Sequence, residues 1–309
     1  MADERLRKIS FTGSTGVGAT LLEQAAPGII NTSMELGGDG PFIVLDDADV
    51  ELAAQQAVVC KFRNAGQACV AANRIIVHSA VAAEFTARFV ELARALNVGN
   101  GFEPGVDVGP IISERQRDTV VELVETLRAT GAELLIGGSA RPGPGFFFEP
   151  TVFRVTGRPA ELCSRELFAP VATIYQVEST ADAVAFANDT RYGLAAYVFT
   201  KNLSRAVAVG ERLDFGMVGI NRGIMADPAA AFGGVKASGL GREAGTTPST
   251  TISRPNTSPS PSTRKKACHD RHHRLAVAHR QPAGPGVAPP TGHGAVRAGP
   301  APADRSRRQ

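Results

Sequence analysis

Short apolar runs alternate with amphipathic segments along the first 245 residues of this 309-residue chain. The runs at 74–78 and 171–177 have the length and composition of buried strands. Segments 50–62 and 81–96 carry apolar residues at helical spacing. Regular alternation of this kind is typical of α/β proteins, in which helices connect the strands of a sheet. We therefore predict an α/β fold.

Individual boundaries can be read from the same pattern. Asp49 is a good N-cap for the helix at 50–62, because its carboxylate can accept hydrogen bonds from the first turn. The predicted strands are 8–12, 32–36, 42–45, 74–78, 133–136, 171–177, 195–200 and 217–221. The predicted helices are 14–25, 50–62, 81–96, 114–130, 181–188 and 203–213. Residues 137–145 are rich in Gly and Pro and are predicted to form a surface loop.

Composition divides the chain near residue 245. Residues 1–245 hold 22 Lys+Arg and 28 Asp+Glu, whereas residues 246–309 hold 11 basic and 2 acidic residues. The second part also has 10 of the 20 prolines, five of the six histidines and no aromatic residue. Because it is so poor in large apolar groups, we expect residues 246–309 to form a disordered basic tail. Out-of-frame translation of a G/C-rich gene would produce such a mixture, and we expect a frameshift near residue 245.

Two segments contain the residues of a covalent mechanism. Residues 62–69, Phe-Arg-Asn-Ala-Gly-Gln-Ala-Cys, place the Cys69 thiol in a loop of small residues, and Glu35 lies within Met-Glu-Leu-Gly-Gly at 34–38. A cysteine that forms and then releases a thioester needs a base that activates water. An isolated cysteine is more often a small buried hydrophobe, and a lone glutamate is more often exposed. Cys60 and Cys163, in helical or apolar surroundings, are interpreted as inert.

These segments and their spacing resemble the aldehyde dehydrogenase superfamily, and four further segments agree in order. Those segments are residues 9–18, 166–171, 188–194 and 232–243. The resemblance covers about residues 5–245 and is greatest to the succinate-semialdehyde dehydrogenase branch. It implies a catalytic domain at 38–245, a remnant of the dinucleotide-binding domain at 1–37, and a truncated N-terminus. It also implies that Cys69 is the nucleophile and Glu35 the base.

The resemblance further implies an NAD or NADP site. Gly13 and Ser14 lie at a predicted helix N-terminus, which suits a pyrophosphate, although a simple N-cap explains them equally well. Leu36 and Gly37 are also expected beside the cofactor. Glu166 and Phe168 match the positions that hold the nicotinamide ribose and its ring, and their alternatives are a helix-start Glu and a core Phe. Ala169 stands where relatives have Gly, so we expect the turn to adopt a positive φ less readily.

On the substrate side, the resemblance implies Arg63 and Phe232. Arg63 is expected to bind the distal carboxylate of the substrate, since a guanidinium binds carboxylates bidentately. Alternatively, its charge could interact favourably with the negative end of the helix dipole at a helix C-terminus. Ala226 replaces a carboxylate-binding Ser of the succinate-semialdehyde branch, and Ala231 replaces a Pro. The implied reaction is NAD(P)-dependent oxidation of an aldehyde, with succinate semialdehyde favoured. The alternative is a non-catalytic remnant.

Other classes of function receive less support. The four cysteines do not suggest a disulfide scaffold, and the His-rich stretch at 268–273 lacks paired cysteine spacing, so we predict no metal site. No apolar run approaches ~18 residues, and residues 1–8 are too polar for a signal peptide. We therefore expect a cytoplasmic protein without membrane or nucleic-acid partners. The family forms homo-oligomers, but we expect its association strands to be missing here.

Overall fold

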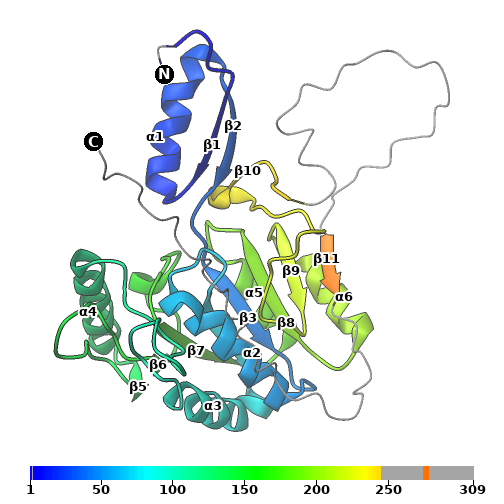
Figure 1. Cartoon of the computed structure of the whole chain (residues 1–309). Coiled ribbons are helices and arrows are strands. Elements are labelled where there is room, and N and C mark those ends of the chain that lie inside the picture. Colours follow the sequence, from blue (N-terminus) through cyan, green and yellow to red (C-terminus); the bar gives the residue numbers. More distant parts are fainter. Residues whose placement is uncertain (2, 245–273, 278–309) are drawn as a thin grey trace, which may run out of the picture. The chain divides into compact units, whose positions relative to one another are not determined.

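The alternating pattern builds two β-sheets within the part of the chain that the computed structural model describes, residues 1, 3–244 and 274–277 (Figure 1). The strands are β1 (Lys8–Thr12), β2 (Asn31–Glu35), β3 (Gly40–Val44), β4 (Ala72–His78), β5 (Glu133–Ile136), β6 (Thr151–Arg154), β7 (Val171–Val177), β8 (Ala195–Phe199), β9 (Met217–Ile220), β10 (Gly239–Leu240) and β11 (Arg274–Val277). The α-helices are α1 (Thr15–Ala25), α2 (Val50–Phe62), α3 (Ser79–Arg94), α4 (Glu114–Ala129), α5 (Thr180–Asn188) and α6 (Leu203–Arg212). Short 3₁₀ turns are η1 (Ala26–Gly28), η2 (Arg63–Gly66), η3 (Ala160–Leu162) and η4 (Lys236–Ser238).

The larger sheet has the strand order β11-β9-β8-β3-β4-β7-β6-β5 among the described residues. Its strands pair in parallel, except that β5 runs antiparallel to β6. The smaller sheet pairs β1 with β2 in parallel and β2 with β10 in antiparallel orientation. Through β10, Gly239 is paired with Glu35, although the two are far apart in sequence.

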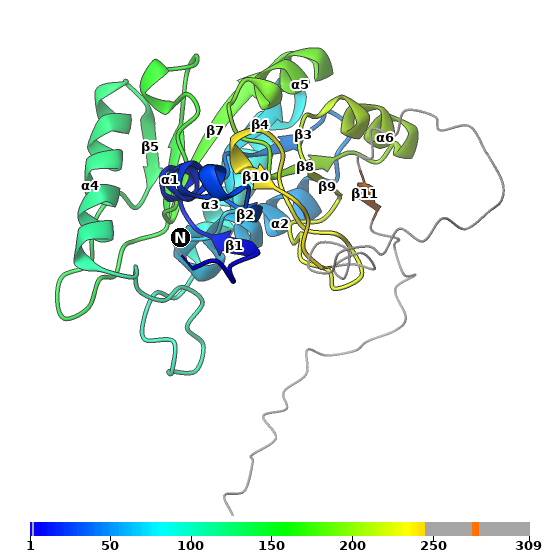
Figure 2. The same ribbon diagram turned by 90° about the horizontal axis from the view of Figure 1, so that it is seen from above.

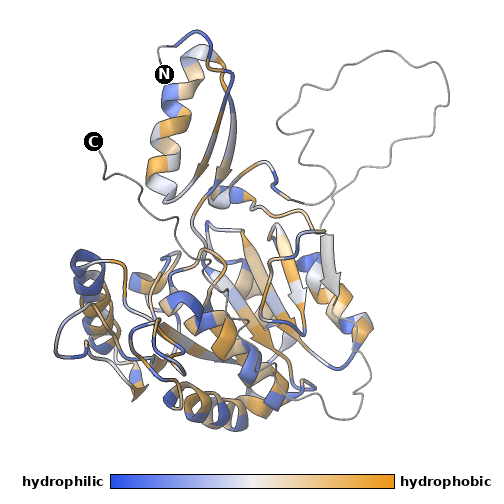
Figure 3. Cartoon of the chain, viewed as in Figure 1, coloured by the Kyte–Doolittle hydropathy of each residue, from blue (hydrophilic) through white to orange (hydrophobic). Residues whose placement is uncertain are grey.

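Helices cover both faces of the larger sheet (Figures 1 and 2). Helices α2 and α3 contact each other and strand β4, whereas α5 contacts β3, β4 and β7, and α6 contacts β8 and β9. Successive side chains of β3 point to opposite faces, so Phe42 and Val44 belong to one hydrophobic cluster and Ile43 to the other. Figure 3 shows the helices with both hydrophilic and hydrophobic segments, as helices with one buried side require.

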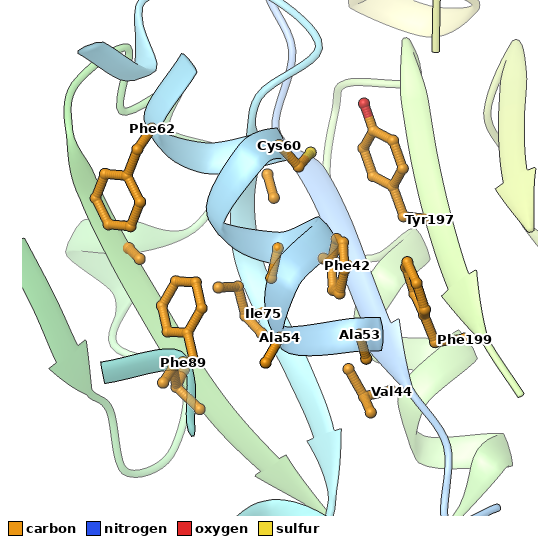
Figure 4. Close-up of a cluster of buried hydrophobic side chains, with 14 of the residues drawn as sticks. Phe42, Val44, Ala53, Ala54, Cys60, Phe62, Ile75, Phe89, Tyr197 and Phe199 are labelled. Carbon is orange, nitrogen blue, oxygen red and sulfur yellow. The ribbon is translucent and has the colours of Figure 1, made fainter. Parts of the chain in front are cut away.

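Stacked aromatic rings form much of the core beneath α2 (Figure 4). The ring of Phe42 stacks on Phe199 with centroids 4.6 Å apart and lies 5.8 Å from the ring of Tyr197. Phe62, near the C-terminal end of α2, stacks on Phe89 of α3 at 5.9 Å. All of these side chains are almost fully buried. The core therefore holds α2, and with it the segment that follows, at a defined place on the sheet.

The α/β fold predicted from the sequence is confirmed. Helix α2 spans the predicted 50–62, and the Asp49 carboxylate accepts a hydrogen bond from the backbone N–H of Leu52 at 3.1 Å. Strands β6 and β10 were not predicted, and the second has only two residues, which is too few to show a strand pattern. Strand β11 lies inside the segment expected to be a disordered tail, and it pairs with β9. The rest of that tail lies outside the described residues.

The boundary between the two parts expected at residue 37 falls where the chain changes sheet. It leaves the smaller sheet at Glu35 and enters the larger one at Gly40. Strand β10 later returns to the smaller sheet, and the described residues up to Val277 belong to one compact unit. Division into a cofactor-domain remnant (1–37) and a catalytic domain (38–245) therefore remains an interpretation of the sequence.

Replacing Phe42 by Ala should lower the free energy of unfolding by about 3–5 kcal/mol, since the change empties a fully buried position between two aromatic rings. Urea unfolding followed by circular dichroism measures the difference. Phe102, which is 98% exposed, provides the matched control, and Phe102→Ala should change stability by less than about 0.5 kcal/mol. Equal losses in the two variants would contradict the assignment of Phe42 to the core.

Candidate active site

Glu35 is the last residue of β2 and only 3% of its surface is exposed. Its Oε2 has no hydrogen-bond partner among the described residues. Burial and, to a smaller extent, the charge of Glu243 raise the pKa of Glu35 to about 8, against the opposing effect of Arg242. The alternative of an ordinary exposed carboxylate is therefore wrong. A carboxyl group whose pKa lies near neutral pH is suited to accept a proton.

Cys69 lies in a turn between η2 and β4, reached through an unusual backbone path. Asn64, Ala65 and Gly66 have φ values of 56°, 53° and 68°, so three consecutive residues adopt the left-handed region. This conformation is unfavourable for Ala65 in particular, and such strain concentrates at functional sites. The Asn64 side chain donates to the carbonyl of Gln67 at 2.8 Å and holds the loop together. The sequence predicted a small-residue loop here, but not its left-handed turn.

The Gly37–Gly38 turn packs directly against the Cys69 turn. A Cβ at Gly38 would clash with the carbonyl oxygen of Cys69, so only glycine permits this approach. The N–H of Gly38 donates to Oε1 of Glu166 at 3.0 Å, and a Cβ at Gly37 would lie 2.5 Å from Oε2 of the same carboxylate. The glycine turn therefore brings the segments of Glu35, Cys69 and Glu166 together.

Electrostatics support the same proximity. Burial raises the pKa of the Cys69 thiol, and the charges of Glu166 and then Glu35 raise it further. The backbone N–H groups of Cys69 and Val70 act in the opposite direction. Burial also raises the pKa of Glu166, while its bond from Gly38 lowers it. Cys69 is only partly buried, whereas Cys60 is buried with its pKa raised to about 11.

The segment after Glu166 turns at Phe168 and not at the following residue. Phe168 has φ 45°, whereas Ala169 is absent from the residues with positive φ in the described chain. The expectation that Ala169 limits the turn is therefore not supported, because the left-handed position lies one residue earlier. Fully buried Ala169 places its carbonyl where a Cβ on Gly66 would clash, so it restricts the Cys69 loop instead.

The residues expected near the cofactor phosphates surround the start of α1. Ser14 is the N-cap, with Oγ accepting from the N–H of Val17 at 3.4 Å, and it is exposed. The N–H of Gly13 donates to the carbonyl of Glu35 at 3.0 Å, which ties the start of α1 to the base candidate. Leu36 is buried against Gly18 of α1. The interpretation of Ser14 as an N-cap is confirmed, and a role in cofactor binding stays a prediction.

The two substrate candidates approach from different segments. Arg63 is exposed at the C-terminal end of α2, and its charge lowers the pKa of both Cys60 and Tyr197. Phe232 is partly buried and packs against the core cluster beneath α2. The next residue, Gly233, lies so close to Glu35 that an added Cβ would be 2.9 Å from Oε1. The substrate-binding roles of Arg63 and Phe232 stay predictions.

A buried polar network behind the glycine turn was not found from the sequence. Lys61 is fully buried, and its Nζ lies 3.4 Å from Oδ1 of Asn73. Asn73 in turn donates to the carbonyl of Gly38 at 3.2 Å. Burial lowers the pKa of Lys61 to about 7, against the opposing charges of Cys60, Asp39 and Glu166. Lys61 lies four residues after buried Ala57 of α2, on the same face of the helix, and this spacing could have indicated that Lys61 is buried.

Asp39 and Arg74 form a second buried pair in this region. Nε of Arg74 lies 3.0 Å from Oδ2 of Asp39, so the two side chains form an ion pair. The contact does not have the geometry of a hydrogen bond. The guanidinium also donates to the carbonyl oxygens of Asp39, Phe186 and Ala187. These bonds fix the start of β4 against the end of α5 and thereby support the chain that leaves the Cys69 turn.

Ser238 connects the motif segments that occur together in the sequence. Its side chain donates to the carbonyl of Gly37 at 2.7 Å and accepts from the N–H of Gly193 at 2.9 Å. Its own carbonyl accepts from the N–H of Leu36 at 2.9 Å. This fully buried serine thus ties segments 34–38, 188–194 and 232–243 into one structure. Nothing in the sequence of segment 232–243 indicates this role for Ser238.

Comparison with known proteins identifies the family to which these motifs belong. The sequence profile described as the aldehyde dehydrogenase family matches residues 1–256. The chain belongs to the aldehyde dehydrogenase family. The resemblance identified from the sequence is therefore confirmed.

Named relatives within this family are semialdehyde dehydrogenases. The chain is 46% identical over 245 residues to succinate-semialdehyde dehydrogenase of Paenarthrobacter nicotinovorans, covering 79% of this chain and 54% of that protein. It is 43% identical to glutarate-semialdehyde dehydrogenase of Pseudomonas putida, covering 77% and 49%. The crystal structure of an E. coli NADP-dependent enzyme matches with TM-score 0.76 and 45% identity, covering 77% and 50%. The chain thus spans about half the length of the relatives that it matches.

The described residues offer neither a metal-binding cluster nor a membrane-spanning helix. Within residues 1, 3–244 and 274–277 there is no group of three His, Cys, Asp or Glu side chains arranged to hold a metal ion. Helices in the part of the chain that the structure covers are each too short or too polar to span a bilayer. The His-rich stretch at 268–273 lies outside the described residues.

Gly66→Ala should destabilise this aldehyde dehydrogenase chain by about 3 kcal/mol or more, because the position combines φ 68° with a backbone clash against Ala169. Gly101→Ala is the matched control, since nothing lies within 4 Å of its added Cβ. Guanidinium unfolding of the two variants tests the difference. A stability equal to wild type for Gly66→Ala would show that the turn does not need its left-handed glycine.

Glu35→Gln should stabilise the fold in a pH-dependent way. The pKa of Glu35 is raised from 4.5 to about 8 in the folded chain, so ionisation costs stability as pH rises through this window. The glutamine variant avoids that cost, and its advantage over wild type should grow by roughly 1–3 kcal/mol between pH 5 and pH 8. Urea midpoints at the two pH values measure it. Exposed Glu23→Gln should show no such change, and a pH-independent difference for Glu35→Gln would contradict the raised pKa.

Proposed function

We propose that this chain carries the thiol and the base of an aldehyde dehydrogenase that oxidises a semialdehyde with a distal carboxylate. The observation that carries the proposal is the junction of Cys69 with the Glu35–Gly38 segment. Gly38 packs on the Cys69 carbonyl, and the charge of Glu35 acts on the Cys69 thiol. The family and its semialdehyde-oxidising relatives provide the independent support.

Cys69 has the chemistry required for the first step. Its sulfur attacks the aldehyde carbon as the thiolate and forms a thiohemiacetal whose oxygen carries the negative charge. The backbone N–H groups of Cys69 and Val70 favour the ionised thiol, and donors of this kind can stabilise the negative charge of the thiohemiacetal. Loss of hydride from the carbon then leaves a thioester on Cys69.

Glu35 has the chemistry required for release. Its carboxylate takes a proton from water as the water oxygen attacks the thioester carbon, and the Cys69 thiolate is the leaving group. Burial without a hydrogen-bond partner for Oε2 leaves one carboxylate oxygen available to accept that proton. A pKa of about 8 places Glu35 close to the pH at which a general base works well.

The residues present fit the phosphate and nicotinamide side of a dinucleotide. The first turn of α1 is exposed at Ser14, Gly16 and Val17, and its N–H groups suit a pyrophosphate. Glu166, held by Gly38, has a second carboxylate oxygen against Gly37 that suits a ribose hydroxyl. When bound, NAD or NADP supplies the acceptor for the hydride. The E. coli structure is that of an NADP-dependent enzyme, and parallel assays with NAD and with NADP decide which of the two this chain uses.

Succinate semialdehyde is the substrate that we favour, with exposed Arg63 binding its distal carboxylate. Glutarate semialdehyde is one methylene longer, and a second relative is a glutarate-semialdehyde dehydrogenase. A single methylene changes transition-state binding by about 1–3 kcal/mol. The ratio of kcat/KM for the two semialdehydes therefore discriminates between them.

The decisive test uses the full 309-residue chain with succinate semialdehyde and either cofactor. Cys69→Ser should abolish formation of reduced cofactor, whereas Glu35→Gln should form the thioester and release it at least about 100-fold more slowly, since general-base catalysis contributes about that much. Intact-protein mass spectrometry detects the acylated Cys69. In wild type, thioester release should rise with pH and level off above about 8. Exposed Cys163→Ser is the matched control and should behave as wild type.

Two outcomes would contradict the proposal. Turnover that survives Cys69→Ser would exclude this thiol as the nucleophile. Folded wild-type protein that gives neither reduced cofactor nor an acylated cysteine would instead support the non-catalytic alternative. Circular dichroism of the same samples separates that result from a failure to fold.

A further inference from the structure

The carbonyl of Val70, one residue after Cys69, accepts from two buried side chains of different elements. The hydroxyl of Tyr197 on β8 donates at 2.6 Å, and the Cys60 thiol on α2 lies 3.8 Å from the same oxygen. Figure 4 shows Cys60 and Tyr197 facing one another at one end of the hydrophobic cluster. The Val70 carbonyl is thus held between the sheet and the helix that covers it.

Tyr197 differs from the aromatic residues around it because its ring carries a polar group. Its neighbours Phe42 and Phe199 fill the same cluster with rings that carry no polar atom, and Tyr197 itself is fully buried. A buried hydroxyl costs free energy unless it is hydrogen-bonded, so a phenol at this position requires a partner. The partner is the chain that leaves the Cys69 turn. Leu194 of the same segment packs near Gly38, so β8 supports both sides of the junction.

The neighbouring peptide groups connect this bond to the thiol. The Val70 carbonyl belongs to the peptide group that follows the Cys69–Val70 peptide, and the two groups share the α-carbon of Val70. Because each peptide group is planar, holding the Val70 carbonyl also restrains the α-carbon to which the Cys69–Val70 peptide is attached. A donor fixed on this carbonyl therefore limits how far the Cys69 turn can shift at its C-terminal end.

We propose that Tyr197 is a positioning residue for Cys69, whose hydroxyl fixes the Val70 carbonyl and so holds the Cys69 turn, and with it the thiol, in place against the sheet. The inference rests on the nucleophilic role proposed above for Cys69 and adds a residue from another strand to that site. Cys60 assists as a weak second donor to the same oxygen.

The test is alkylation of Cys69 in the full chain, which requires no turnover. Iodoacetamide reacts with the thiolate, and peptide mass spectrometry reports modification of each cysteine separately across pH 6–10. Tyr197→Phe removes one oxygen and should move the Cys69 curve to higher pH, with a rate at pH 7.5 about three- to tenfold lower. With semialdehyde as substrate, kcat should fall by a similar factor while KM changes less, because the group acts through the nucleophile.

Tyr175→Phe is the matched control. Tyr175 is also a buried tyrosine, at 4% exposure, but it lies on a different strand, β7. Removal of the Tyr175 hydroxyl should leave the alkylation curve of Cys69 unchanged even where it lowers stability. Site-specific replacement of Tyr197 by 3-fluorotyrosine keeps the ring and makes the hydroxyl a stronger donor, so alkylation at pH 7.5 should become faster.

An unchanged Cys69 curve in folded Tyr197→Phe would overturn the proposal and leave the hydroxyl with a purely structural role. Should that variant fail to fold, the fluorotyrosine protein decides, and an unchanged or slower reaction overturns the proposal there. Failure of the proposed function has a different signature, namely turnover that survives Cys69→Ser. The two results are read from separate experiments.

Discussion

The site depends on a steric constraint at Gly38. Its α-carbon lies against the Cys69 carbonyl, its N–H holds the Glu166 carboxylate, and its own carbonyl accepts from Asn73. Any side chain at this position would separate the turn after β2 from the turn before β4. Because Glu35 lies only three residues before Gly38, the same close approach determines where the base candidate lies relative to the thiol.

Burial of charge is the second determinant of the site. Glu35, Glu166 and Lys61 all have pKa values displaced by desolvation toward the neutral form, and Asp39 is displaced in the same sense despite its pairing with Arg74. Such groups cost stability, and a fold retains them most readily where neutral and ionised forms must interconvert. The surrounding core of stacked aromatic rings provides the free energy that offsets this cost.

Strain and polar bonds then orient the nucleophile. Asn64, Ala65 and Gly66 turn the chain in the left-handed region immediately before Cys69, and Val70 is held immediately after it by Tyr197. The Ser238 side chain bonds to the carbonyl of Gly37 and links a distant segment to the same junction. Elements from several parts of the sequence therefore restrict one short turn, as a preorganised site requires.

The sequence by itself determined the α/β class, the six α-helices and eight of the eleven strands of the described residues, and the family. Periodicity and capping are local properties, so the Asp49 cap and the limits of α2 followed from neighbouring residues alone. The motifs also identified Cys69 and Glu35 as candidates. Only the tertiary structure decided that Glu35 is buried, that the left-handed residue near Glu166 is Phe168, and that Lys61, Ser238 and Tyr197 support the site. These features arise from contacts between segments far apart in the chain, which local patterns do not encode.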